Sequence, residues 1–323
     1  MAHQAPPLEL TEQDATVTDD LAEILEGLSR PQKTLSPKFF YDEAGSLLFE
    51  QITELPEYYP TQTELSIMQD KVHEMVALIG AEASLIEFGS GSSLKIRLLL
   101  EHMIRPAAYV PVDISKEHLL ASAENLAADF PNIEILPVAA DFTQPFALPN
   151  PIIAPVRNVI YFPGSTIGNF SPDDAKSLLE VMHEEAGEGG ALLIGVDLQK
   201  SVKVLERAYD DSAGVTASFN LNLLQRLNNE FGADFDLDAF EHVAYYNSAK
   251  SRIEMHLKSL KAQTVTIGGR RFEFESGEML HTENSHKYTL ASFSELASSA
   301  GFTVHTVWMD EREYFSIQYC VRD

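Results

Sequence analysis

The fold is decided by one stretch of the chain, Leu85-Ile86-Glu87-Phe88-Gly89-Ser90-Gly91-Ser92-Ser93-Leu94-Lys95. Its apolar first part predicts a strand that ends at Phe88, and a helix is expected to begin near Ser92. Between them lie Gly89 and Gly91, where a backbone without side chains can approach a ligand closely. A strand, a glycine-bearing turn and a helix of this kind form the first unit of a nucleotide-binding α/β sheet.

The next expected strand, Ala108–Val112, is followed by Asp113, which can accept hydrogen bonds from two ribose hydroxyls. A dinucleotide fingerprint has a third glycine three residues after the second, and Leu94 stands at that position here. The turn is therefore more consistent with S-adenosylmethionine (SAM), which has no pyrophosphate to cradle. A nicotinamide-dependent oxidoreductase is the less favoured alternative.

Apolar strands alternate with helices through the middle of the chain. We expect strands at Leu85–Phe88, Ala108–Val112, Ile133–Pro137, Val159–Phe162 and Ala191–Asp197. Because this alternation produces parallel sheets, it predicts a doubly wound α/β fold. Two further strands, Phe302–Trp308 and Tyr314–Val321, close the chain as a hairpin-like pair. That ending is typical of the class I SAM-methyltransferase sheet, which is Rossmann-like.

The pattern changes after Asp197 and indicates a second lobe. Apolar and polar residues alternate from Ile253 to Lys258 and predict a strand with one buried face. Gly268-Gly269 predicts the turn of a hairpin. We therefore divide the chain into a SAM-binding core (residues 61–199 plus 286–323), an α+β substrate-binding lobe (15–60 plus 200–285) and a flexible tail (1–14).

Polar residues mark the expected starts of three helices. Ser46 is placed as the cap of a helix over Leu47–Leu55. Thr61-Gln62-Thr63-Glu64 has the spacing of a capping box and predicts the start of a longer helix. Ser171 is followed by Pro172 and two aspartates. It predicts a third start, because proline fits the first turn and acids stabilise the positive end of the helix dipole.

The composition limits the partners of the chain. It has 323 residues and a formal net charge of -26, which would repel nucleic acid and anionic membrane surfaces. The single cysteine, Cys320, excludes an internal disulfide and is consistent with a reducing compartment. The sequence has no signal-peptide pattern and no apolar run of about 18 residues. We expect a cytoplasmic monomer that acts on a small molecule, with no nucleic acid or membrane partner.

Five residues are expected at the carboxyl ends of the parallel strands, where ligands of open α/β sheets bind. They are Gly89, Gly91, Asp113, Asp141 and Phe142. Asp141 can accept a hydrogen bond from the adenine amino group while Phe142 flanks the ring, and a loop carboxylate or helix cap is its alternative role. Lys95 can reach the methionine carboxylate of SAM, with a surface lysine as the alternative.

Two further segments carry groups that suit a small substrate. The fourth strand leads into Phe162-Pro163-Gly164-Ser165-Thr166-Ile167-Gly168-Asn169-Phe170. Asn169 can bind an amine or a carboxylate there, or it can cap the turn before Ser171. Tyr41 and Tyr58 belong to a tyrosine-rich entry region. Their rings can face a cation and their hydroxyls can bind a carboxylate, and packing at an interface is the alternative explanation.

A late strand carries His281-Thr282-Glu283-Asn284-Ser285-His286. Because side chains alternate along a strand, Glu283 and Ser285 point to the same face. Their carboxylate and hydroxyl can bind the two nitrogens of an imidazole ring, since the carboxylate accepts from an N–H and the hydroxyl pairs with the other nitrogen. The same alternation places His281 and His286 on opposite faces, so we expect no metal site.

Taken in this order, the segments resemble the histidine-specific, SAM-dependent Nα-methyltransferase family of ergothioneine biosynthesis, which makes hercynine. The resemblance runs from Phe39 to the C-terminus. Its most specific matches are Tyr41-Asp42-Glu43-Ala44-Gly45-Ser46, Leu55-Pro56-Glu57-Tyr58-Tyr59-Pro60-Thr61, the Phe162–Phe170 segment, Arg252-Ile253-Glu254-Met255 and Thr282-Glu283-Asn284-Ser285.

The resemblance implies SAM as the cofactor and trimethylation of the α-amino group of L-histidine as the reaction. Fungal relatives of this fold act on tryptophan derivatives, which makes another amino acid the nearest alternative substrate. The Glu283 and Ser285 pair favours histidine. A non-catalytic SAM-binding protein is a further, less favoured alternative.

The resemblance also implies roles for individual residues. Glu283 and Ser285 would bind the imidazole ring, and Met255 would line its pocket. The other end of the substrate would meet Tyr58, Asn169 and Tyr209 at its α-amino and carboxylate groups, and Tyr41, the candidate catalytic residue, near the reacting amine.

Overall fold

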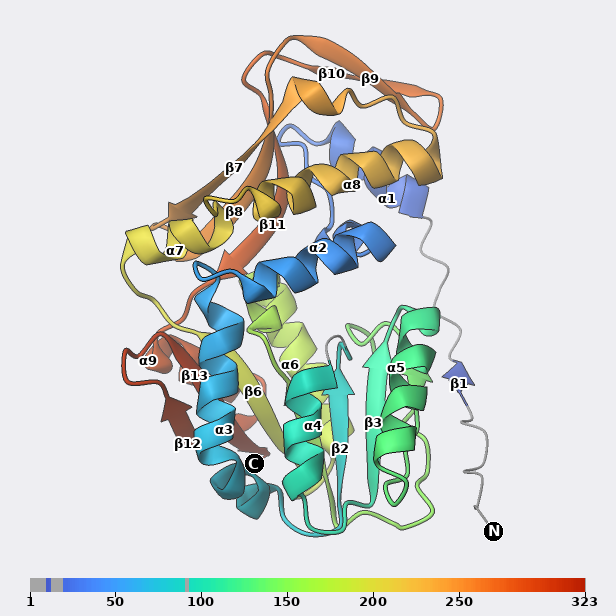
Figure 1. Ribbon diagram of the computed structural model, residues 1–323, viewed down its shortest axis with the longest axis vertical. Helices are drawn as coiled ribbons and strands as arrows, with labels where there is room; N and C mark the ends of the chain where they lie inside the picture. Colours follow the sequence, from blue (N-terminus) through green and yellow to red (C-terminus); the bar gives the residue numbers. More distant parts are fainter. Residues whose placement is uncertain (1–9, 13–19, 91–92, 323) are drawn as a thin grey trace.

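The computed structural model describes residues 10–12, 20–90 and 93–322. They form one large sheet with helices on both faces and two smaller sheets with further helices above it (Figure 1). The strands of the large sheet, in spatial order, are β1 (Thr11–Glu12), β4 (Val138–Ala139), β3 (Ala108–Asp113), β2 (Ala83–Phe88), β5 (Arg157–Phe162), β6 (Ala191–Asp197), β13 (Phe315–Arg322) and β12 (Phe302–Met309).

Neighbouring strands of this sheet are parallel except at β13, which is antiparallel to both β6 and β12. The chain builds outward from β2 through β3 to β4 and then returns to place β5 on the other side of β2. The strand order therefore reverses between β2 and β5. Ligands of doubly wound sheets bind at such a reversal, beyond the carboxyl ends of the strands. The expected α/β fold with a closing antiparallel pair is confirmed.

Helices cover both faces of the large sheet. On one face lie α3 (Tyr59–Ile79), α4 (Ser93–His102) and α5 (Lys116–Asp129), and on the other lie α6 (Pro172–Ala186) and α9 (Leu290–Ser299). Successive side chains of a strand point to opposite faces of the sheet and enter different hydrophobic cores. Leu85 therefore packs with α3 and α4, while Ile86 packs with α6. In the described part of the chain, no helix is both long enough and apolar enough to cross a membrane.

The smaller sheets and their helices lie on the side of the large sheet toward which β2 and β3 point (Figure 1). The strands are β7 (Phe240–Asn247), β8 (Arg252–Ser259) and β11 (Met279–His286) in one sheet and β9 (Gln263–Ile267) and β10 (Arg270–Phe274) in the other. The helices beside them are α1 (Asp20–Ser29), α2 (Glu43–Glu54), α7 (Val202–Tyr209) and α8 (Val215–Phe231), with short 3-10 turns at η1 (Pro37–Phe40) and η3 (Leu237–Ala239). A separate hydrophobic core joins these elements.

The helix expected at Leu47–Leu55 begins earlier than its predicted cap. The observed helix α2 starts at Glu43, because the Asp42 carboxylate accepts a hydrogen bond from the Gly45 backbone N–H at 2.7 Å. Ser46 therefore lies inside the helix, and its predicted capping role is wrong. Asp42, which precedes Ser46 in the chain, caps the helix instead.

The predicted capping box at Thr61–Glu64 is also wrong. Helix α3 starts at Tyr59 with Pro60 in its first turn. Glu64 therefore lies inside the helix, too far from its first residue to complete a capping box. The third expected start is confirmed, because the Ser171 hydroxyl accepts from the Asp174 backbone N–H at 3.2 Å. The hairpin expected at Gly268-Gly269 is also present between β9 and β10.

The strand expected at Ile133–Pro137 is shifted along the chain. The observed strand β4 covers Val138–Ala139, and Ile135 makes only an isolated bridge to Tyr109. Pro137 has no N–H to give to a ladder, and its carbonyl accepts from the Thr11 N–H at 3.1 Å. Thr11–Glu12 thus pairs as β1, within the segment that is expected to be a flexible tail. Residues 1–9 and 13–14 of that tail lie outside the described residues.

We predict that Gly195→Ala destabilises the fold, because Gly195 sits in β6 directly beneath the Glu64 carboxylate. A Cβ there would overlap a Glu64 oxygen and lie 3.0 Å from the Phe315 ring. The free energy of unfolding in urea should fall by about 1–3 kcal/mol, as in other overpacked cores. The same substitution in a Glu64→Ala background should cost clearly less. An equal cost in both backgrounds would contradict this account.

Candidate active site

The carboxyl ends of β2, β3 and β4 bring together four of the residues expected to bind SAM. Gly89 follows β2 with a φ of 77°, which favours glycine, and its N–H donates to the Val112 carbonyl at 2.9 Å. A Cβ on Gly89 would lie 3.6 Å from the Phe142 ring. Asp113 ends β3, and Asp141 stands just beyond β4. One edge of the sheet thus carries a glycine that leaves room for a ligand, an aromatic ring and two carboxylates.

The two aspartates hold different local bonds. Burial raises the pKa of Asp113, whose Oδ1 accepts from the Ser115 backbone N–H at 2.8 Å. Asp141 closes a turn, since its Oδ1 accepts from the Thr143 backbone N–H at 2.9 Å and from the Thr143 hydroxyl at 2.7 Å. All three of these bonds end on an Oδ1 atom, and the backbone N–H groups of Ile114 and Ser90 also bond to the Asp113 carboxylate. The turn explains why aspartate suits position 141 even before a ligand is considered.

Lys95 pairs with Glu64, the residue that was expected to close a capping box. Its ammonium contacts the carboxylate of Glu64, whose side chain is 1% exposed. Glu64 also accepts from the Gly164 backbone N–H at 3.0 Å. The ion pair therefore lies near the reversal of strand order, between α3, α4 and the end of β5. Gly91, the second glycine expected at this site, lies outside the described residues.

These groups fit the adenosine part of SAM. Phe142 packs against Phe88 and Phe162 with ring centroids 5.6 and 6.0 Å apart, which holds its ring beside Gly89. A flat base can lie against such a ring, and a carboxylate at the end of the second strand can bind the ribose hydroxyls. The arrangement is compatible with the binding of adenosine.

A second set of expected residues surrounds a small cavity between α2, α7, α8, β8 and β11. Its lining residues are Phe49, Ile52, Tyr58, Ala208, Tyr209, Thr216, Phe219, Met255 and Glu283. Four of these, Tyr58, Tyr209, Met255 and Glu283, were expected to touch the substrate. The cavity volume of about 20 Å³ is enough for one water molecule. A ring-bearing substrate must therefore move side chains aside as it enters.

Aromatic rings form one side of this cavity. The Phe49 ring lies 5.7 Å from the ring of Tyr41 and 6.3 Å from that of Tyr58, measured between centroids. Tyr58 in turn lies 6.1 Å from Tyr209, and Phe219 contacts Phe49 at 5.9 Å. Tyr41 is 46% exposed, so it stands at the solvent side of the group. Ring faces of this kind can stabilise a cation.

A β-bulge in β11 decides where its polar side chains point. The register with β8 shifts between His281 and Glu283, and the Thr282 hydroxyl donates to the Met255 carbonyl at 3.1 Å. Beyond the bulge, Glu283 lies opposite Met255 and Ser285 lies opposite Ile253. These β8 residues belong to the core on the cavity side. Glu283 and Ser285 therefore share that face, as the alternation predicts.

The bulge also overturns the expectation for the two histidines. His281 lies opposite His256 and His286 lies opposite Arg252, and these two β8 residues share one face. His281 and His286 are therefore on the same face of the sheet, turned away from Glu283. A one-residue bulge reverses the alternation after it, and the sequence gives no mark of its position.

The pKa of the Glu283 carboxyl lies near neutral pH. Burial raises its pKa to about 7, and the ammonium of Lys287 partly offsets that shift. A carboxylate in this place can accept an N–H from a bound ring. Protonation leaves a neutral and weaker acceptor, so the strength of ring binding depends on the charge of this one group.

A buried polar network joins the cavity to the large sheet. The Ser285 and Tyr209 hydroxyls are 2.7 Å apart, and the Lys287 ammonium donates to both, at 2.7 and 2.9 Å. Lys287 also pairs with Asp197 at 2.7 Å, and Lys200 contacts the same carboxylate. Sequence reasoning missed Lys287 and Asp197. The available signals were that Lys287 directly follows the late polar strand and Asp197 ends a buried one.

Asn169 occupies a neighbouring position at the end of η2 (Thr166–Asn169), beyond β5. This turn packs closely on β11, because a Cβ on Gly168 would lie 2.8 Å from the His286 carbonyl oxygen. Asn169 is half-buried. The close contact holds it beside the strand that carries Glu283 and Ser285.

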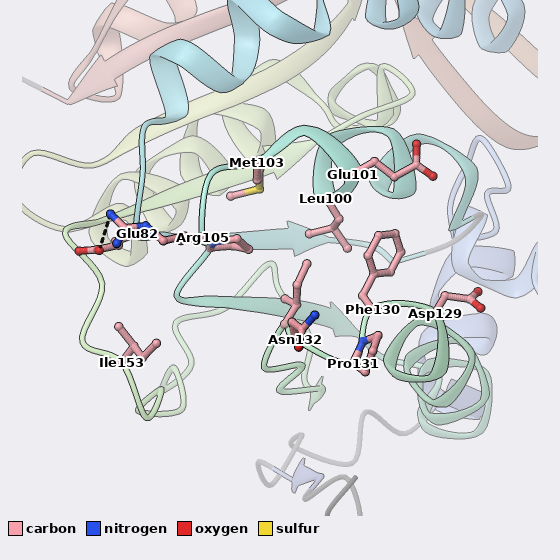
Figure 2. A pocket seen from close by; sticks show the side chains of 12 residues that line it. Glu82, Leu100, Glu101, Met103, Arg105, Asp129, Phe130, Pro131, Asn132 and Ile153 are labelled. Carbon is pink, nitrogen blue, oxygen red and sulfur yellow. Dashed lines mark ion pairs between the residues drawn. The ribbon is translucent and has the colours of Figure 1, made fainter. Parts of the chain in front are cut away.

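A larger hollow of about 590 Å³ lies at the opposite edge of the large sheet (Figure 2). Its lining includes Leu100, Met103 and Phe130, and an ion pair of 3.0 Å joins Arg105 to Glu82 there. This edge carries the amino ends of β2 and β3, whereas ligands of doubly wound sheets bind at the carboxyl ends. Among the described residues, those expected at the site lie elsewhere, so this hollow is not the candidate active site.

We predict that Glu283→Gln stabilises the unliganded protein at alkaline pH. A folded-state pKa of about 7, against an ordinary value of 4.5, means that folding favours the protonated form. The stability that the group contributes is present below about pH 4.5 and is lost as the pH rises through about 7. Above that pH, Glu283→Gln should raise the free energy of unfolding by up to roughly 3 kcal/mol. Glu273→Gln, at an exposed position of β10, is the matched control. A constant difference at every pH would be the contrary result.

Comparison with known proteins agrees with this site. The family described as "Histidine-specific methyltransferase, SAM-dependent" matches residues 20–322. The histidine N-alpha-methyltransferase of Mycolicibacterium smegmatis is 42% identical, over 92% of this chain and 92% of that protein. The protein of the same name from Mycobacterium tuberculosis is 38% identical, over 93% and 94%. An L-tryptophan methyltransferase of Psilocybe serbica is 27% identical, over 93% and 91%. The chain belongs to the histidine-specific, SAM-dependent methyltransferase family.

Proposed function

We propose that this enzyme trimethylates the α-amino group of L-histidine to give hercynine, the first step of ergothioneine biosynthesis. The observation that carries the proposal is the pairing of a carboxylate and a hydroxyl, Glu283 and Ser285, on one face of β11 beside an aromatic cavity. Such a pair complements the two nitrogens of an imidazole ring, one of which bears hydrogen. The names of the two bacterial relatives support the same substrate.

The two halves of the reaction would be handled by two parts of the chain. We assign SAM to a core of residues 61–199 plus 286–323, and histidine to a lobe of residues 15–60 plus 200–285. The separate hydrophobic core shared by α1, α2, α7, α8 and the smaller sheets supports this division. Residues 15–19 of the proposed lobe lie outside the described residues.

On the cofactor side, Asp113 would bind the ribose hydroxyls, and Asp141 with Phe142 would hold the adenine. Gly89 and Gly91 would leave room for the bound molecule. Lys95 would bind the methionine carboxylate, for which its present partner Glu64 would have to share the ammonium. Bound SAM supplies a methyl group on a positively charged sulfur. A neutral nitrogen can attack this methyl carbon, and the sulfur then leaves as a neutral thioether.

On the substrate side, Glu283 and Ser285 would bind the ring, with Met255 at its edge. Tyr58, Asn169 and Tyr209 would together hold the α-amino and carboxylate groups. The Tyr209 hydroxyl already bonds to Ser285, so it would reach the substrate from beside the ring. Holding both ends of the substrate fixes the nitrogen in place, and positioning of this kind is the main contribution we assign to the protein.

The amine must be neutral to react, because an ammonium has no lone pair. A cationic sulfur nearby lowers the amine pKa, since like charges disfavour each other. Tyr41 is 46% exposed and would connect the amine to solvent. Its hydroxyl would accept the amine proton while it gives its own proton to a water, or a water would receive the amine proton directly. The rings of Phe49, Tyr58 and Phe219 would face the growing trimethylammonium group and stabilise it.

We propose that the enzyme works as a cytoplasmic monomer on a small molecule, without nucleic acid or membrane partners. The formal net charge of -26 supports the exclusion of polyanionic partners. The single cysteine is buried in β13 and its pKa is raised by burial, which suits an inert core thiol.

We predict that incubation with SAM and L-histidine gives products with one, two and three added methyl groups, with the trimethyl form accumulating. Mass spectrometry of the reaction measures this directly. L-Tryptophan at the same concentration should give no methylated product. Glu283→Ala should lower kcat/KM for histidine strongly, because a ring N–H is left unpaired. Methylation of tryptophan in preference to histidine would contradict the proposal.

We predict that Asp113→Ala weakens SAM binding by about ten- to a hundredfold, because it removes a charged acceptor from the ribose hydroxyls. The dissociation constant measured by calorimetry is the readout. Asp129→Ala is the matched control, since Asp129 forms a partly exposed surface pair with Arg97 at a distance from the proposed site. Unchanged SAM affinity in Asp113→Ala would remove Asp113 from the cofactor site.

A further inference from the structure

Lys287 lies beneath the pocket with its side chain 0% exposed. Three oxygen atoms surround its ammonium: Asp197 Oδ2 at 2.7 Å, Ser285 Oγ at 2.7 Å and the Tyr209 hydroxyl at 2.9 Å. An ammonium has three N–H donors and no acceptor, so these contacts use all of its hydrogens. Lysine is almost never buried this deeply unless its partners require it.

Neutralising Asp197 does not by itself explain Lys287. Lys200 contacts Oδ1 of the same carboxylate, and the Tyr59 hydroxyl lies 2.8 Å from Oδ2. The two lysines bring one positive charge more than Asp197 balances. Asp310 acts on Lys200 from one side, and Glu283 faces Lys287 from the pocket side, where the ammonium partly offsets the rise that burial causes in the Glu283 pKa. Lys287 is therefore electrostatically a part of the pocket.

The contacts of Lys287 also restrict the two hydroxyls. Each hydroxyl has one hydrogen and two acceptor sites, and the ammonium fills one acceptor site on each. A further hydrogen lies between Ser285 and Tyr209, and the more acidic phenol is the better donor. Ser285 then has both acceptor sites filled and only its hydrogen to offer. It can donate to the substrate but cannot accept from it.

We propose that Lys287 is a positioning residue that fixes Ser285 as a hydrogen-bond donor, so that the pocket selects a neutral imidazole. The inference rests on the proposed function and adds the polarity of the ring site. Glu283 accepts from the ring N–H, and Ser285 donates to the bare ring nitrogen. In a protonated imidazole, the nitrogen that faces Ser285 carries a hydrogen of its own and cannot accept the Ser285 hydrogen. An indole has no bare nitrogen that could accept it.

The first test uses Lys287→Met, which keeps the length of the side chain and removes its donors and charge. Binding of L-histidine is measured by calorimetry with S-adenosylhomocysteine present, from about pH 5.5 to about pH 9. The dissociation constant should rise about tenfold or more, while SAM affinity stays within about twofold. The pH at which binding is half lost should move up by about one unit, because Glu283 loses its nearest cation.

The groups that face Glu283 are the ammonium of Lys287 and the hydroxyls of Tyr41, Tyr58 and Tyr209. Lys200→Met is the matched control, because it removes the other cation from Asp197 and leaves the Ser285 and Tyr209 contacts intact. It should weaken histidine binding clearly less than Lys287→Met does, because the contacts of Lys200 are with Asp197 and the Tyr59 hydroxyl rather than with Ser285 or Tyr209. An equal loss and an equal pH shift in both variants would reduce Lys287 to a structural counter-ion and overturn the proposal.

Lys287→Arg keeps the charge but replaces three converging donors with a planar fork. It should weaken histidine binding while the half-loss pH stays near that of the unaltered enzyme. Wild-type affinity in Lys287→Arg would contradict the donor geometry.

A measurement on unaltered enzyme covers the case in which the lysine variants do not fold. The probe is 3-(pyrrol-2-yl)alanine, whose ring has an N–H but no bare nitrogen. It should bind the unaltered enzyme about tenfold or more weaker than histidine, and Ser285→Ala should remove most of that difference. Equal affinities in the unaltered enzyme would overturn the proposal. If the unaltered enzyme did not bind histidine, the proposed function would fail instead.

Discussion

One buried carboxylate holds the two parts of this molecule in register. Asp197 ends β6, is 0% exposed and meets Lys200, Lys287 and the Tyr59 hydroxyl. These partners come from the start of α3, the segment before α7 and the residue after β11, so one charge joins the large sheet to the strand that carries the pocket. Burial alone would raise the pKa of Asp197, and the two lysines hold it below its ordinary value. The carboxylate therefore stays charged, and the joint depends on paired ions rather than on apolar contact alone.

The chemistry of the site follows from that joint. The end of β6 belongs to the edge where the proposed SAM site lies, and the residue after β11 lies beneath the proposed ring site. A sulfur-bound methyl and an amine nitrogen meet productively only when the two sites are held at a fixed separation. The bulge in β11 completes the arrangement, because it turns Glu283 and Ser285 toward the aromatic cavity while His281 and His286 face away.

Much of the fold could be predicted from local pattern. The strand that ends at Phe88, the aspartate after the next strand and the Ser171 cap depend on neighbouring residues, and each is found as predicted. The capping box at Thr61–Glu64 failed because α3 already begins at Tyr59, which leaves Glu64 inside the helix and able to pair with Lys95. Four expected substrate residues line one cavity, which separate segments of sequence could only suggest. The buried Lys287 and Asp197 pair joins residues far apart in the chain, and no local spacing marks it.

The most direct test of the account is a crystal structure with L-histidine and S-adenosylhomocysteine bound. The account predicts the imidazole ring between Glu283 and Ser285, with one nitrogen within hydrogen-bond distance of each, and the α-amino nitrogen directed at the sulfur. The Lys287 ammonium should still contact Ser285 and Tyr209. A ring that points away from both Glu283 and Ser285 would contradict the account.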